Sequence, residues 1–145
     1  MFLHATAVAL RTGQSWQAAV LRGPSGAGKS DLALRLIDAG GRLIADDQTH
    51  VTVADGALFA SAPPVLAGRL EVRGIGIIDL PEANKIDRAR ITLLVDLVPS
   101  SHVERMPDPA HEMVLGVALP LVRLAPFEAS AVAKLRLAMT RMPAA

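Results

Sequence analysis

A phosphate-binding loop pattern stands out near the N-terminus. Residues 23–30 read Gly-Pro-Ser-Gly-Ala-Gly-Lys-Ser and fit G-x-x-x-x-G-K-[ST] at every fixed position. Glycines in such a loop let consecutive backbone amides approach phosphate oxygens without side-chain obstruction. Lys29 supplies a compact charge for the terminal phosphates, and the Ser30 hydroxyl can reach a magnesium ion. The residues predicted to bind a nucleotide or polyphosphate are therefore Gly23, Pro24, Ser25, Gly26, Ala27, Gly28, Lys29 and Ser30.

The segments on either side of this loop are predicted to be a strand and a helix. Residues 16–22 are mostly apolar and predict a buried strand. Apolar residues then recur at helical spacing until a glycine pair ends the pattern: Leu32, Ala33, Leu36 and Ile37, followed by Gly40 and Gly41. A position between strand and helix is typical of a phosphate loop. The alternative is an ordinary Gly/Ser turn that caps a helix.

Two adjacent carboxylates follow the next apolar segment. Residues 42–47 predict an apolar strand whose last two residues are Asp46 and Asp47. An acidic residue in this place is the expected partner of a phosphate loop. Successive strand side chains point to opposite faces, so the two should serve different partners unless the strand breaks between them. One would lie near the metal and the other near the attacking hydroxyl; a solvated strand end is the alternative.

The rest of the chain contains hairpin signals more often than strand–helix–strand crossovers. Strands are expected over 3–10 and 16–22, 51–53 and 57–60, 91–98 and 118–124, the last interrupted by Pro120. Residues 70–79 are expected to alternate and then turn through two glycines into a buried run. Loops are expected over 81–90 and 99–109 and a helix over 128–142. We therefore predict one α/β domain over residues 1–145, of the P-loop kinase kind, with a mixed, largely antiparallel sheet and flanking helices. On spacing alone, Glu71 and Arg73 share one face of a strand, where a cross-strand ion pair at the sheet surface would explain them, and His4 is either exposed or catalytic.

Composition excludes several classes of function. The chain has 15 Lys+Arg and 14 Asp+Glu, evenly interspersed, so no basic field predicts binding to nucleic acid or anionic lipid. It has no cysteine, which suits a reducing compartment and predicts a cytoplasmic protein. The longest uncharged segment, 56–68, contains two prolines and is shorter than the ~18 apolar residues of a membrane helix. We expect no membrane insertion, no targeting segment and, from the histidine spacing, no zinc site.

Four segments together resemble the catalytic domain of bacterial HPr kinase/phosphorylase. They are residues 23–30, Ala45-Asp46-Asp47, Ala62-Pro63-Pro64 and the decapeptide Leu-Glu-Val-Arg-Gly-Ile-Gly-Ile-Ile-Asp at 70–79, which is the specific part. The resemblance is continuous from about His4 to Pro81. It implies an ATP- and Mg²⁺-dependent kinase that phosphorylates a serine of HPr, the phosphocarrier of the sugar phosphotransferase system, and can reverse this with inorganic phosphate. It also implies a homo-oligomer, a hexamer.

The resemblance implies a catalytic set of His4, Lys29, Asp46, Asp47 and Arg105. Asp47 matches the carboxylate that takes the serine proton in the kinase direction and returns it in the reverse one, with Asp46 beside it. Ser30 and Glu71 match the family's magnesium ligands. Residues 103–106 resemble an Asp-Arg-Leu segment, which would make Arg105 the catalytic arginine.

Several segments depart from the family pattern. Only three residues precede His4, where the family usually has a further domain, and Glu82-Ala83-Asn84-Lys85 replaces a glycine-rich loop. Residues 120–126 replace a Pro-Val-Arg-Pro-Gly-Arg segment tied to dephosphorylation, and the chain stops soon after Met142. Kinase machinery is thus expected to be retained, whereas the phosphorylase activity and the HPr docking surface are not established by the pattern.

Two other functions remain open at this point. One is a nucleotide-sensing regulatory module that binds a partner such as a sensor kinase with little turnover, which the altered segments favour. Retention of Asp47 and Arg105 argues against it, since a sensor needs neither. The other is a kinase for a small metabolite, which rests on the phosphate loop alone.

Overall fold

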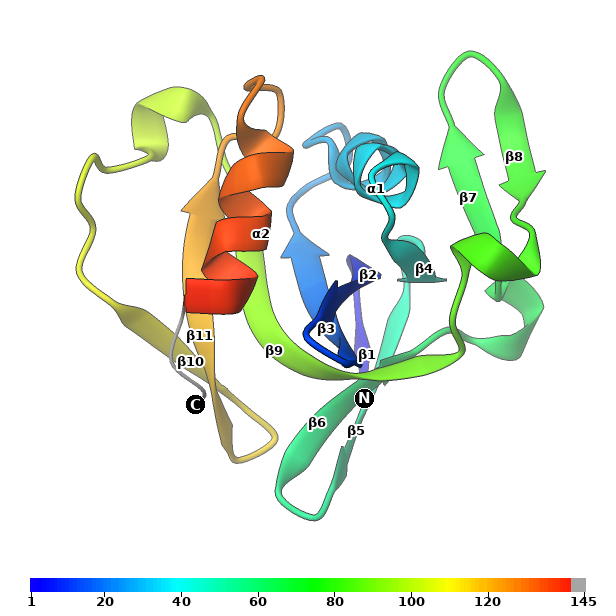
Figure 1. Ribbon diagram of the computed structural model, residues 1–145, viewed down its shortest axis with the longest axis horizontal. Coiled ribbons are helices and arrows are strands. Elements are labelled where there is room, and N and C mark those ends of the chain that lie inside the picture. Colours follow the sequence, from blue (N-terminus) through cyan, green and yellow to red (C-terminus); the bar gives the residue numbers. More distant parts are fainter. Residues whose placement is uncertain (142–145) are drawn as a thin grey trace.

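The computed structural model describes residues 1–141, in which a curled sheet carries two α-helices on one side (Figure 1). The helices are α1 (Lys29–Asp38) and α2 (Ala131–Arg141), with short 3₁₀ turns η1 (Pro64–Leu66), η2 (Glu82–Asn84) and η3 (Ser100–His102). The strands are β1 (Phe2–Leu3), β2 (Ala5–Thr12), β3 (Ser15–Arg22), β4 (Arg42–Ala45), β5 (Thr49–Ala54), β6 (Ala57–Ser61), β7 (Arg69–Val72), β8 (Gly76–Asp79), β9 (Arg88–Leu97), β10 (Ala110–Val114) and β11 (Val117–Leu124).

Strand β9 is the centre of the main sheet. One edge pairs in parallel with β3; the other pairs antiparallel with β6 through its first residues and in parallel with β11 through its last. The sheet continues from β3 to β2 and β4, from β6 to β5 and β1, and from β11 to β10. The β7–β8 hairpin forms a separate sheet that stands beside α1 (Figure 1). Within residues 1–141 the other pairings between strands are antiparallel, so the predicted mixed, largely antiparallel α/β fold is confirmed.

The core consists of two apolar clusters on opposite faces of the sheet. Alternation along β2 and β3 sends Val8 and Leu21 to the face that packs against Leu36 of α1 and Leu135 of α2. The intervening small residues, such as Ala7, face a second cluster that β5, β6 and β11 supply. Because both faces of the sheet are covered, the sequence of β2 is an almost continuous run of apolar residues. This burial fixes the strand ends that carry the polar site.

The predicted strand–loop–helix unit is confirmed. Strands β2 and β3 form a hairpin, and β3 leads into the loop that precedes α1. Gly40, in the left-handed region at φ 104°, donates its amide to Ile37 O, and the Gly41 amide donates to Leu36 O. This pair of bonds is a Schellman motif, and it ends α1 at the glycine pair. The predicted hairpin around Asp55-Gly56 is confirmed as β5–β6.

Some boundaries differ from those expected. Strand β9 begins at Arg88, inside the predicted loop 81–90, because the side chains of Ala89 and Ile91 alternate inward between exposed arginines. Strand β10 was not predicted, because three of its five residues are exposed and its sequence has neither an apolar run nor a regular polar–apolar alternation. Strand β11 passes through Pro120, which has no backbone N–H to donate. The pairing with β9 begins only at the next residue, Leu121, so the proline interrupts no hydrogen bond between the two strands.

The C-terminal helix is confirmed with a later start. Helix α2 begins at Ala131 rather than Glu128, and it buries Leu135 and Met139. Met142, the predicted last residue of this helix, lies outside the described residues. Neither α1 nor α2 has the length and apolar character that a membrane crossing requires.

Candidate active site

The phosphate loop lies between the end of β3 and the start of α1. A turn within it is closed by the Ala27 amide, which donates to Pro24 O at 3.0 Å. Gly26 and Gly28 are both in the left-handed region, at φ 83° and 100°, where residues with a side chain are strained. A Cβ on Gly28 would also lie 2.9 Å from Phe127 Cζ. The two glycines are therefore required by the fold of the loop itself.

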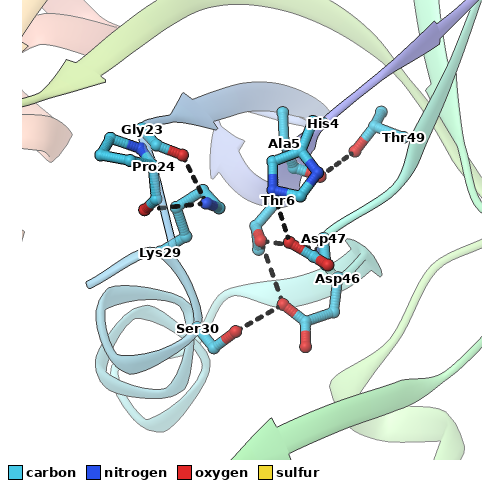
Figure 2. A network of polar contacts seen from close by, with 10 residues as sticks. All are labelled: His4, Ala5, Thr6, Gly23, Pro24, Lys29, Ser30, Asp46, Asp47 and Thr49. Atoms are coloured by element: carbon cyan, nitrogen blue, oxygen red, sulfur yellow. Dashed lines mark hydrogen bonds and ion pairs between the residues drawn. The ribbon is translucent and has the colours of Figure 1, made fainter. Parts of the chain in front are cut away.

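Lys29 is the only charged residue among the buried polar ones of residues 1–141. Its ammonium turns back to the loop and donates to the carbonyls of Gly23 at 2.5 Å and Pro24 at 3.3 Å (Figure 2). Carbonyl oxygens satisfy the donors of a cation that is otherwise costly to bury. The charge is thus held at the loop, within reach of any anion that the loop binds.

Asp46 is the hub of the polar network in Figure 2. Its Oδ1 accepts hydrogen bonds from the Ser30 hydroxyl at 2.7 Å and from the Thr6 hydroxyl at 3.0 Å. Its Oδ2 accepts the backbone amide of Glu71 at 3.1 Å. One carboxylate therefore ties the last residue of the phosphate loop to β2 and β7. A hydroxyl and a carboxylate in contact at this place are the donor set that Mg²⁺ prefers.

Asp47 turns away from this contact. Strand β4 ends at Ala45, and Asp47 adopts φ 66°, so a sharp backbone turn rather than strand alternation separates the two carboxylates. The Asp47 amide donates to Thr6 Oγ1 at 3.1 Å, and its Oδ1 lies 3.3 Å from His4 Nε2. The side chains of His4 and Asp47 are 60% and 61% exposed, so this pair faces solvent.

Glu71 reaches the cluster through its backbone, while the residue itself is exposed. In residues 1–141 no group of three or more His, Cys, Asp and Glu side chains is placed to hold a metal. Mg²⁺ is commonly bound by one or two carboxylates together with phosphates of the substrate, so this geometry fits a metal that arrives with a nucleotide. Ser30, Asp46 and Glu71 are the residues that could share it.

Arg105 is the one predicted catalytic residue that the structure does not bring into contact with this cluster. It is exposed in the segment between η3 and β10, and within the described part of the chain its side chain makes no hydrogen bond or ion pair. Arg73, expected on one face with Glu71, lies in the β7–β8 turn. The ion pair on that hairpin is Arg69–Asp79, at 3.2 Å.

Comparisons with known proteins identify the family of this chain. A sequence model of the HPr Serine kinase C-terminal domain matches residues 17–139. The chain belongs to this family. The solved structure of the HPr(Ser) kinase/phosphatase from Coxiella burnetii is similar with a TM-score of 0.78 and 25% identity, over 96% of this chain and 92% of that one.

Curated relatives match a shorter stretch of this chain. The HPr kinase/phosphorylase of Clostridium tetani is 52% identical over 62 residues, which are 43% of this chain and 20% of the relative. That of Clostridium botulinum (strain Eklund 17B / Type B) is 51% identical over 63 residues, 43% of this chain and 21% of the relative. The match thus spans about a fifth of the length of these relatives. The family expected from the phosphate loop and the 70–79 decapeptide is confirmed.

An ion-pair cluster in this domain was not predicted from the sequence. Arg22, the last residue of β3, directs its guanidinium to Asp96 of β9, with Nε to Oδ1 at 2.8 Å, and to Glu112 of β10, with Nη1 to Oε2 at 2.5 Å. The hydrogen bond that Arg22 donates to Glu112 raises the pKa of Arg22 above its ordinary value, against the effect of burial. The same bond lowers the pKa of Glu112, again against burial. The sequence signal that could have revealed this cluster is the charged residue that stands at each of the three strand positions, Arg22, Asp96 and Glu112.

Replacing Glu112 by glutamine is expected to lower the free energy of unfolding at neutral pH by about 1 kcal/mol, a modest value because the side chain is 39% exposed. A depressed pKa stabilises the fold above the unfolded-state pKa, and this contribution disappears as the pH falls through the folded-state pKa. The difference between wild type and Glu112→Gln should therefore shrink below about pH 4. Urea titrations of both proteins at neutral pH and below about pH 4 measure this difference in the free energy of unfolding.

Glu82→Gln is the matched control for that titration. Glu82 pairs with Lys85 at 3.4 Å, but its side chain is 94% exposed, so little stability should depend on its charge. A Glu112→Gln difference that is as large in acid as at neutral pH would show that the loss comes from packing rather than from the ion pair.

Proposed function

We propose that this chain is a Mg²⁺- and ATP-dependent protein kinase that transfers the terminal phosphoryl group of ATP to a serine of HPr or an HPr-like phosphocarrier. The observation that carries the proposal is the contact between Ser30 and Asp46, which joins the phosphate loop to a carboxylate directly beside the Asp47–His4 pair. Family membership supports the substrate class. The absence of cysteine suits a reaction in the cytoplasm.

The exposure of the acid–histidine pair supports a macromolecular substrate. Asp47 and His4 lie at the protein surface, where a serine on another folded protein could reach them, whereas a small metabolite is usually enclosed. A nucleotide held by the loop would present its terminal phosphate between Lys29 and this pair. This favours protein phosphorylation over the metabolite kinase that the loop alone would also allow.

The chemistry of transfer is mostly positioning and neutralisation of charge. The ammonium of Lys29 would exchange the loop carbonyls for phosphate oxygens, and the backbone amides of the loop would bind the others. Mg²⁺, when bound, supplies further positive charge to the phosphates. Asp47 would orient the serine hydroxyl and take its proton late, as the bond to phosphorus forms, because a carboxylate is a weak base for an alcohol. His4 would hold Asp47 in place.

Phosphopeptide mapping tests this proposal. HPr incubated with the chain, ATP and Mg²⁺ should carry phosphate on one serine, with none on histidine and none when Mg²⁺ is chelated. Excess inorganic phosphate added afterwards tests the reverse reaction, since phosphorolysis would remove the group and release pyrophosphate. Unmodified HPr in the presence of bound ATP would contradict the kinase assignment and favour a nucleotide-sensing module, whose affinity for a partner should not depend on Asp47.

A further inference from the structure

Phe127 occupies an unusual place for an apolar side chain. It lies in the connection between β11 and α2, and this connection runs beside the phosphate loop in Figure 1. The Phe127 ring reaches Gly28 so closely that a Cβ there would lie 2.9 Å from Cζ and 3.2 Å from Cε1. Even so, the residue is 71% exposed. One edge of the ring thus contacts the loop while most of its surface faces solvent.

The backbone on both sides of this ring is fixed. Leu124 and Ala125 are buried in front of it, and Ala131 is buried at the first position of α2 behind it. The guanidinium of Arg35, on α1, donates to the carbonyl of Pro126. The exposure of Phe127 is therefore imposed by the fold rather than by a loose segment, and the ring is held at the mouth of the loop.

The other aromatic residues all have partners. Phe2 stacks on His50 with ring centroids 4.7 Å apart. The guanidinium carbon Cζ of Arg42 lies 4.6 Å from the centroid of the Trp16 ring, and that of Arg88 lies 3.8 Å from the centroid of the Phe59 ring. Among residues 1–141, Phe127 is the aromatic residue without a stacked or cationic partner. A free ring face beside a phosphate-binding loop suits a ligand that is anionic at one end and flat and apolar at the other.

A purine nucleotide has this combination of groups. Its phosphates would be bound by the amides of the loop and by Lys29, and its base lies one ribose away from them. Stacking on an aromatic side chain binds a base through its π-face without requiring hydrogen bonds to its edge. We propose, on the basis of the nucleotide binding in the proposed function, that Phe127 is the base-binding residue of this site and stacks on the purine of ATP or ADP.

Paired binding titrations test the role of this ring without any turnover. We expect Phe127→Ala to weaken the binding of MgADP about tenfold. Magnesium pyrophosphate, which has no base, should bind the wild type and Phe127→Ala equally. Phe127→Trp should retain the affinity for ADP. Leu137→Ala, which removes an exposed apolar side chain from α2, is the matched control and should change neither affinity.

Three results would overturn the proposal. An unchanged affinity of Phe127→Ala for ADP would do so, including the case in which only HPr binding is weakened. An equal loss of ADP and pyrophosphate binding would show instead that the ring shapes the phosphate loop. Wild type that binds neither ligand would contradict the proposed function as well, so the failure of the two proposals is distinguishable. Thermal unfolding of each variant establishes that it is folded.

Discussion

Replacing Lys29 by alanine is expected to lower kcat/KM for phosphoryl transfer to HPr about a thousandfold. Its ammonium is buried and held at the phosphate loop by the carbonyls of Gly23 and Pro24. A buried and fixed charge such as this ammonium stabilises the charge that develops on the moving phosphoryl group far more than it would in solution. Initial rates at several ATP concentrations separate the loss in kcat from the loss in affinity.

Two further variants test whether the loss of activity in Lys29→Ala comes from the missing charge. Lys29→Met keeps the aliphatic stem in its buried site and should lose as much activity as Lys29→Ala, since only the charge matters. Lys134→Ala removes an ammonium from an exposed pair with Glu128 and should leave kcat/KM unchanged. Activity of Lys29→Met close to that of wild type would mean that the ammonium is a structural clamp for the loop and not a catalytic group.

Substitutions of the two neighbouring carboxylates, Asp46 and Asp47, should affect different steps, MgATP binding in one case and phosphoryl transfer in the other. Asp47→Asn is expected to lower kcat about a hundred- to ten-thousandfold, since it removes the carboxylate proposed to take the serine proton. Its affinity for MgATP should be unchanged, because Asp47 contacts His4 and Thr6 but not the phosphate loop. Asp46→Asn is the matched variant at the adjacent position. It should weaken MgATP binding, because Asp46 Oδ1 accepts the Ser30 hydroxyl.

The two Asp variants can be compared by MgATP titration and single-turnover transfer on the same preparations. The reverse pattern, in which Asp47→Asn loses ATP and Asp46→Asn retains it, would exchange the two roles. Turnover of Asp47→Asn at the wild-type rate would exclude Asp47 as the proton acceptor and leave His4 as the remaining candidate beside it.

Local sequence signals predicted most of the fold for physical reasons. Glycine pairs, Asp-Gly turns and apolar runs act within a few residues, so the β2–β3 and β5–β6 hairpins and α1 were placed correctly. The position of β10 depends instead on pairing with β11 across the sheet, which leaves no apolar run in its own residues. The start of β9 was missed because Arg88 and Arg90, although charged, lie on an exposed strand face.

The site could be predicted only in part, because some of its residues have no signature of their own. The loop pattern identified Lys29 and Ser30, and the adjacent carboxylates were expected to diverge, as they do through the turn at Asp47. Thr6 was missed: a threonine in an apolar strand is common, and only the fold brings its hydroxyl between Asp46 and the Asp47 amide. Contacts of this kind join residues about forty positions apart and have no local pattern.

The central claim is tested most directly by the intact mass of HPr after incubation with this chain, ATP and Mg²⁺. The account predicts that wild type adds the mass of one phosphoryl group, that Lys29→Met adds none, and that the adduct is absent without Mg²⁺. HPr that keeps its original mass while the chain binds MgATP would contradict the account, because every group needed for transfer would then be present without the reaction.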